Sequence, residues 1–96
     1  MSRCDLTPQA RLDLIEIWNY IAQDNIDMAD RVLKEIDKAM DNLVDHPEMG
    51  HWREDLVDRR HRLWTLYSYH LIYRTETTPL QVVRILHASR DIAEIL

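Results

Sequence analysis

The residues best suited to chemistry are arginines and histidines that gather toward the C-terminal end of the chain. Residues 59–96 carry six basic and three acidic side chains, a formal charge of +3. All six cations are arginine: Arg59, Arg60, Arg62, Arg74, Arg84 and Arg90. Arginine presents a planar fork of N–H donors that binds carboxylates and phosphates bidentately. His70 and His87 lie among these arginines and are able to transfer protons near neutral pH. This part of the chain is therefore expected to face an anionic partner.

The rest of the chain has the opposite charge. Residues 1–58 carry six basic and fourteen acidic side chains, net −8, and the whole chain has a formal charge of −5. Taken alone, that total argues against nucleic acid as a partner, because Lys and Arg contacts to phosphate supply most non-specific affinity. Divided along the chain, the acidity only restricts where an anionic partner binds.

Composition excludes several classes of protein. With 96 residues the chain is expected to form a single domain, 1–96, around one modest core. Its single cysteine, Cys4, excludes an internal disulfide framework and a zinc site with two thiolates. His46 and His51 are spaced wrongly for two ligands on one helix face, so no metal is expected. Gly50 is the only glycine, which excludes a glycine-rich phosphate loop. No cofactor, no membrane segment and a cytoplasmic location are expected.

Two helices are predicted in the first half of the chain. Thr7 is a suitable N-cap and Pro8 a suitable first helical residue for a helix to about Asp24. Its predicted apolar stripe is Leu14, Ile17, Trp18, Ile21 and Ala22, widened by Leu12 and Ile15, with Asp13, Glu16, Tyr20 and Gln23 on the other side. Asp27 is the expected cap of a second helix, whose apolar stripe runs from Ala29 to Val44. It should end before Pro47, so the two helices form an antiparallel hairpin.

Three strands are predicted after this hairpin. Residues 47–50 indicate a turn and residues 51–60 a charged connection. The strands are expected at about 61–66, 69–75 and 80–87, and their short connections require antiparallel pairing. A short strand at residues 3–6 and a final helical turn within residues 89–96 complete the expected elements.

The predicted fold class is α+β: an N-terminal strand, a helical hairpin and a three-stranded antiparallel meander, with the helices packed on one face of the sheet. The other sheet face is left over. Arg62, Arg74 and Arg84 fall one on each strand of the meander and, if they share a face, form a basic platform. Alternation places Arg84 with Val82 and Leu86, and Arg62 with Trp64 and Leu66, so the platform would also be apolar and suited to docking.

Several short motifs occur in a specific order. They are Leu6-Thr7-Pro8-x-Ala10, then Asp13-Leu14-x-x-Ile17-Trp18-x-Tyr20-Ile21, then Ala29-Asp30-Arg31-Val32-Leu33 with Ile36, then Pro47-x-Met49-Gly50, then Tyr69-x-x-x-Tyr73-Arg74, and finally Val83-Arg84-Ile85-Leu86-His87-x-x-Arg90-Asp91. In order and spacing the chain resembles the ParE/RelE superfamily of type II toxins, and specifically its ParE branch. The resemblance runs nearly end to end.

This resemblance implies a toxin that is neutralised by a cognate antitoxin, whose extended helical segment wraps around it. We expect that segment to be acidic and apolar and to lie across the basic sheet half and the groove of the helical hairpin. ParE-type members inhibit DNA gyrase by protein–protein contact, which arrests growth and serves plasmid stabilisation; contact with DNA would be indirect, through the antitoxin. The residues expected to bind antitoxin or target are Arg59, Arg60, Arg62, Trp64, Arg74, Arg84, His87 and Arg90. Arg90 and Asp91 are alternatively expected to tie the chain end to the sheet by an ion pair.

Two other functions remain open at this point. A RelE-like endoribonuclease that cuts mRNA on the ribosome would use Arg62, Arg74 and Arg84 as cations and His87 for proton transfer. The absence of lysine after Lys38 and of tyrosine beyond the middle strand favours an inhibitor over an enzyme. The other alternative is a non-toxic module that only binds the antitoxin as a co-repressor.

Overall fold

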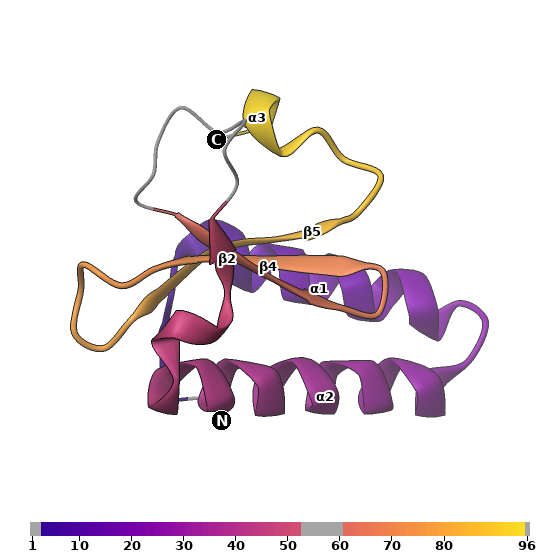
Figure 1. Ribbon diagram of the computed structural model, residues 1–96. Coiled ribbons are helices and arrows are strands. Elements are labelled where there is room, and N and C mark those ends of the chain that lie inside the picture. Colours follow the sequence, from indigo (N-terminus) through magenta and orange to yellow (C-terminus); the bar gives the residue numbers. More distant parts are fainter. Residues whose placement is uncertain (1–2, 53–60, 96) are drawn as a thin grey trace.

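The computed structural model describes residues 3–52 and 61–95. Its elements are β1 (Asp5–Leu6), α1 (Pro8–Ala22), α2 (Ile26–Asp45), the 3₁₀ helix η1 (Pro47–Met49), β2 (His51–Trp52), β3 (Arg62–Leu66), β4 (Tyr69–Arg74), β5 (Gln81–His87) and α3 (Ile92–Ile95). Figure 1 shows α1 and α2 on one side of the sheet and α3 on the other. The predicted α+β class and order of elements are confirmed.

The strands form one mixed sheet in the order β1-β5-β4-β3-β2. β3, β4 and β5 form the predicted antiparallel meander. β1 pairs with β5 in parallel at one edge, and β2 pairs with β3 antiparallel at the other. β2 was not predicted, because two residues within a charged connection carry no alternating pattern.

The helix starts are set by side-chain caps. Thr7 is the N-cap of α1, and its hydroxyl accepts a hydrogen bond from the Ala10 N–H at 3.1 Å. For α2 the predicted cap, Asp27, is wrong. Asn25 has the extended backbone of an N-cap and accepts from the Met28 N–H at 3.0 Å, so Asp27 lies in the first turn. α2 ends at Asp45, before the proline at position 47 as predicted.

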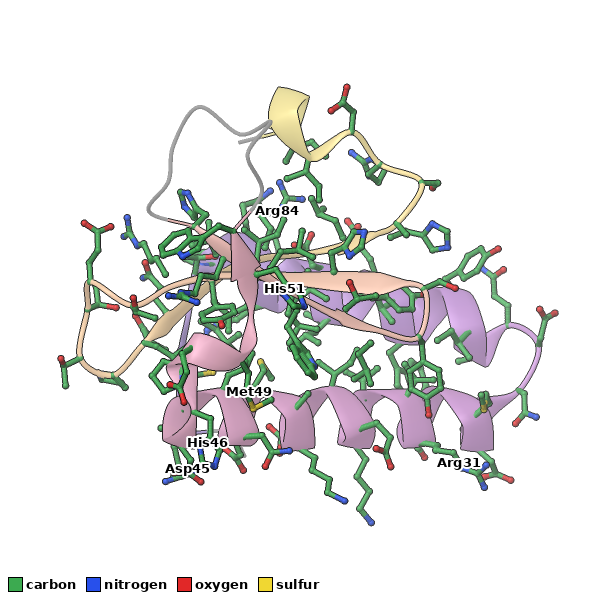
Figure 2. The ribbon with its side chains drawn as sticks, viewed as in Figure 1. Arg31, Asp45, His46, Met49, His51 and Arg84 are labelled. Carbon is green, nitrogen blue, oxygen red and sulfur yellow. The ribbon has the colours of Figure 1, made fainter. Side chains whose placement is uncertain are left out.

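The sheet is buried on both faces at its centre. Leu71 and Tyr73 of β4 pack against α2 in the main core, beside Ile36 and Met40. The intervening Ile72 points to the other face, where it packs with three residues of a second cluster: Leu63, Leu86 and Ile92. The face expected to be left over is therefore partly covered by α3, whose first residue is only 2% exposed. The polar side of α2 points away from the sheet, as Figure 2 shows for its exposed Arg31 and Asp45.

The side of α1 that packs on the sheet differs from the prediction. Leu12 and Ile15, expected to widen the apolar stripe, are 52% and 56% exposed. Asp13, expected on the solvent side, is only 6% exposed. The buried residues of α1 are Ala10, Asp13 and Ile17, which follow helical spacing along a line that contacts β5.

Gly50 has a specific packing reason. The Tyr73 hydroxyl accepts from the Gly50 N–H at 2.8 Å and donates to the Pro47 carbonyl at 2.6 Å. A Cβ at position 50 would collide with that hydroxyl. Burial raises the pKa of Tyr73, so its hydroxyl stays protonated and able to donate at neutral pH. The glycine thus allows β4 to hold the 3₁₀ helix η1 against the sheet.

Candidate functional site

The three strand arginines do not form the expected shared platform. Arg62 lies opposite Tyr73 in the register, whereas Arg84 lies opposite Ile72. Because Ile72 and Tyr73 are consecutive, they point to opposite faces, and so do the arginines that pair with them. A register shift beside Tyr73 adds one residue to β5, and this break in alternation also separates Arg84 from the face of Val82.

Arg62 is engaged at the β2 edge of the sheet. Its guanidinium donates to the Gly50 carbonyl at 3.0 Å and to the Glu48 carbonyl at 3.3 Å. The guanidinium carbon also lies 4.2 Å from the centroid of the Trp52 ring, a cation–π contact. Arg62 therefore fastens η1 and β2 to β3. Trp64, the other predicted contact on this strand, is half-buried against the main core.

Arg74 is engaged in a row of side chains that crosses three strands. Its Nε donates to Gln81 Oε1 at 2.8 Å, and Gln81 Nε2 donates to Asp5 Oδ2 at 3.1 Å. The three residues lie opposite one another on β4, β5 and β1. Arg74 thus orients a glutamine at the parallel edge.

Arg84 forms a bidentate ion pair with Asp13 of α1. Its Nε and Nη2 donate to the two carboxylate oxygens at 2.8 and 3.0 Å, and the side chains of Arg84 and Asp13 are 18% and 7% exposed. Hydrogen bonding to Asp13 raises the pKa of Arg84, so this arginine is charged at any ordinary pH. Asp13 also accepts from the Ile85 N–H at 2.9 Å.

This arrangement follows from the short length of β1. β1 covers β5 only at Gln81 and Val82, so the outer backbone groups of β5 beyond that point have no strand beside them. Side chains at the start of α1 take over: Thr7 Oγ donates to the Val83 carbonyl at 2.6 Å, and Asp13 accepts the Ile85 N–H. Sequence reasoning missed the role of Asp13. The available signal was its spacing from Ala10 and Ile17 along one side of the helix.

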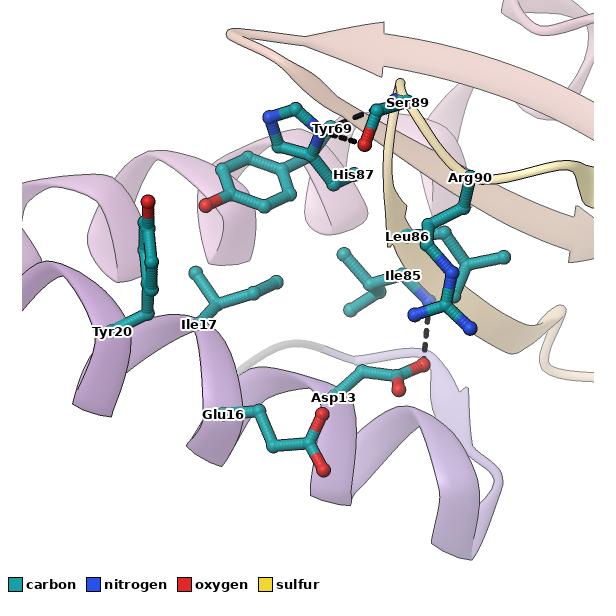
Figure 3. A pocket seen from close by; sticks show the side chains of 10 residues that line it. All are labelled: Asp13, Glu16, Ile17, Tyr20, Tyr69, Ile85, Leu86, His87, Ser89 and Arg90. Carbon is teal, nitrogen blue, oxygen red and sulfur yellow. Dashed lines mark hydrogen bonds between the residues drawn. The ribbon is translucent and has the colours of Figure 1, made fainter.

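A pocket of about 350 Å³ opens beyond this ion pair, between α1 and the end of β5 (Figure 3). Its α1 wall is formed by Asp13, Glu16, Ile17 and Tyr20. The opposite wall is formed by Tyr69, by Ile85 to His87, and by Ser89 and Arg90. Two residues predicted to bind a partner, His87 and Arg90, thus lie together in one pocket, and both are exposed.

His87 is oriented by its neighbours in this pocket. Its Nδ1 accepts from the Ser89 N–H at 3.1 Å and lies 2.8 Å from the Ser89 hydroxyl. Since Nδ1 accepts, the neutral ring carries its proton on Nε2. The Tyr69 ring meets the His87 ring edge to face, with centroids 5.5 Å apart. Burial, and then the proximity of Tyr20, raise the pKa of Tyr69, so its hydroxyl is neutral at physiological pH.

The predicted ribonuclease set is not assembled in the part of the chain that the structure describes. Arg62, Arg74 and Arg84 make three separate contacts, and only His87 among the four residues lines the pocket. Within residues 3–52 and 61–95 there is also no group of three or more side chains able to hold a metal ion. Arg59 and Arg60, both predicted contacts, lie outside the described residues. No described helix is long and apolar enough to cross a membrane.

Comparison with known proteins shows the family to which the chain belongs. Residues 5–92 match the family described as the ParE toxin of the type II toxin–antitoxin system parDE. The chain belongs to this ParE toxin family. It is 31% identical over 93 residues to Toxin ParE1 of Mycobacterium tuberculosis, in both strain CDC 1551 / Oshkosh and strain H37Rv, covering 95% of this chain and 94% of the relative.

A solved structure supports the same fold. The chain superposes with a TM-score of 0.73 on a chain of the "Chromosomal ParDE TA system from P. aeruginosa", covering 91% of this chain and 96% of that one at 21% identity. Several motifs that carried the resemblance now have structural roles in this ParE-family chain. The Thr7-Pro8 pair starts α1, Gly50 admits the Tyr73 hydroxyl, and Arg84 pairs with Asp13. Much of the resemblance therefore lies in residues that stabilise the fold.

Proposed function

We propose that this ParE-family toxin inhibits DNA gyrase by protein–protein contact, without covalent chemistry of its own, and that a cognate antitoxin neutralises it. The observation that carries the proposal is the match to the ParE toxin family over residues 5–92. The engagement of Arg62, Arg74 and Arg84 in three separate structural contacts supports an inhibitor over a nuclease.

The antitoxin is expected to be an acidic and apolar segment. The solved structure with the same fold belongs to a ParDE toxin–antitoxin system, which supports a ParD-type antitoxin for this chain. Two exposed features of the described residues suit such a segment: the apolar Leu12 and Ile15 on α1, and the pocket that holds His87 and Arg90. Arg59 and Arg60 remain predicted contacts.

The gyrase proposal is tested with purified toxin in a DNA supercoiling assay. We expect loss of supercoiling and accumulation of cleaved DNA, both reversed by adding the cognate antitoxin. Normal supercoiling at a large molar excess of folded toxin would contradict the proposal. A toxin that arrests growth yet leaves gyrase unaffected would direct attention to another target.

The two alternatives have their own tests. An endoribonuclease would cleave mRNA at specific sites in translating extracts, and the cleavage would be lost in His87→Ala. A non-toxic co-repressor would be expressed without any growth defect while still binding the antitoxin.

A further inference from the structure

The outer edge of β5 is only partly closed. β1 pairs with it in parallel at Gln81 and Val82, after which the chain turns into α1. Beyond β1, side chains bind the outward backbone groups of β5 only as far as Ile85, whose N–H donates to Asp13. The strand continues to His87, so its last outward backbone groups lie beyond the reach of this cover.

Two of these groups are available for pairing. The N–H and C=O of a strand residue point to the same side, and the side alternates along the strand. Because Ile85 donates outward to Asp13, its carbonyl also points outward, as does the His87 N–H two residues later. The His87 carbonyl accepts from the Arg90 N–H, which fits this alternation. Among described residues, neither the Ile85 carbonyl nor the His87 N–H has a hydrogen-bond partner.

The Ile85 carbonyl and the His87 N–H lie on either side of Leu86, which is the pattern that pairing with a parallel strand requires. One residue of an added strand would donate its N–H to the Ile85 carbonyl and accept the His87 N–H with its own carbonyl. The added strand would run in the same direction as β1, in line with it but on the far side of Asp13. The edge can therefore continue the parallel pairing that β1 begins.

The side chains of such a strand have different surroundings on its two faces. The residue opposite Leu86 points to the face of Leu86, beside which Arg90 lies in Figure 3. Its two neighbours point to the face of Ile85 and His87, toward Ile17 on the α1 wall of the pocket. In a three-residue segment, the middle side chain would therefore lie beside Leu86, and the side chains before and after it would lie beside Ile85 and His87.

The charges at the pocket give that segment a pattern. Arg84 is neutralised by Asp13, which leaves Glu16 on the α1 wall and Arg90 on the opposite wall as exposed charges of opposite sign. Arg90 favours an acidic side chain on the face of Leu86, whereas the buried Ile17 and Ile85 favour apolar side chains on the face of Ile85. The preferred order is apolar, acidic, apolar.

We propose that an extended segment of the cognate antitoxin adds to this edge as a short strand parallel to β5, with an acidic residue opposite Leu86 and apolar residues on either side. The proposal rests on the proposed function, because it takes the antitoxin as the partner. It assigns the pocket between α1 and β5 to strand addition.

Amide hydrogen exchange on the intact complex tests the strand directly. In the free toxin the His87 amide lies at an open edge, and we expect it to exchange at least about tenfold more slowly once full-length antitoxin is bound. The Leu71 amide, in the central strand of the sheet, serves as an internal reference for global stabilisation. An unchanged His87 exchange rate in a saturated complex would overturn the proposal.

Two matched pairs of variants test the same strand by affinity. His87→Pro removes the donor and His87→Ala retains it, so we expect the proline variant to bind antitoxin at least about tenfold more weakly than the alanine variant. Arg90→Glu should weaken binding relative to Arg31→Glu, an equal charge reversal at an exposed position of α2 (Figure 2). Equal affinities within each pair would overturn the proposal.

The outcomes also separate this inference from the proposed function. A folded toxin that binds no antitoxin contradicts the proposed function as a whole. A toxin that binds its antitoxin tightly while the His87 amide remains unprotected contradicts strand addition alone. If His87→Pro fails to fold, the exchange measurement on the unmodified complex still decides the question.

Discussion

The two edges of the sheet are closed in different ways. At the β2 edge, Arg62 binds two main-chain carbonyls and stacks on Trp52, so one cation holds a segment of backbone in place. At the β5 edge, an acid from α1 accepts a backbone N–H and simultaneously pairs with Arg84. Arginines suited to an anionic partner are thus already bound by groups within the protein at both edges. What remains for a partner is the part of an edge that those side chains do not reach.

The largest effect is expected from breaking the β5 edge. Asp13→Ala leaves Arg84 without its carboxylate and the Ile85 N–H without its acceptor, and removing one partner of a buried ion pair costs about 3 kcal/mol or more. Urea unfolding measures the loss. Glu16→Ala, one turn later on the exposed side of α1, should change stability by less than about 0.5 kcal/mol. Equal losses in the two variants would mean that the pair is not what closes this edge.

A smaller loss is expected at the β2 edge from Gly50→Ala. The new Cβ collides with the Tyr73 hydroxyl, which must move away from the Pro47 carbonyl, and overpacking of this kind costs about 1–3 kcal/mol. In the Tyr73→Phe background the hydroxyl is absent, so the same substitution should cost less. A double-mutant cycle measured by urea unfolding gives the coupling. Strictly additive losses would show that the close approach is relieved elsewhere.

Sequence reasoning recovered the elements but missed the contacts that close the edges. Thr7 and Pro8 start a helix by local capping, and the meander follows from short connections, so both are readable from the sequence. Asn25 displaced the predicted cap because either polar side chain suits an N-cap, and only the backbone geometry decides between them. Such local features account for the confirmed fold.

The site was less predictable for a physical reason. The basic platform required Arg62 and Arg84 to share a face. The strand registers pair them with the consecutive residues Tyr73 and Ile72, and such registers cannot be read from residue types. Asp13 was placed toward solvent because a carboxylate is usually exposed; its burial depends on Arg84, which lies 71 positions later in the chain. Pairings at that separation depend on the assembled sheet.

Alkaline pH should weaken the β2 edge through Tyr73. Burial raises the pKa of Tyr73 above its ordinary value of 10.0, so its contribution to stability is fully present below pH 10 and is lost as pH rises through the folded-state pKa. The loss is at most about 1.4 kcal/mol for each pH unit between the two pKa values. Thermal unfolding between pH 8 and 11.5 measures it, and Tyr73→Phe should flatten the curve. An equally steep curve in that variant would assign the loss to other groups.

The smallest difference is expected between two arginines that hold opposite edges. Arg62→Ala removes two hydrogen bonds to carbonyls and a cation–π contact, for a loss of about 1 kcal/mol, whereas Arg74→Ala removes one hydrogen bond to a glutamine and should cost about half as much. Urea unfolding of both variants gives the ranking. Arg62→Lys keeps the charge but loses the planar guanidinium that lies over the Trp52 ring, so it should recover only part of the loss. Full recovery by lysine would show that charge and hydrogen bonding alone, without the guanidinium over the Trp52 ring, fasten the β2 edge.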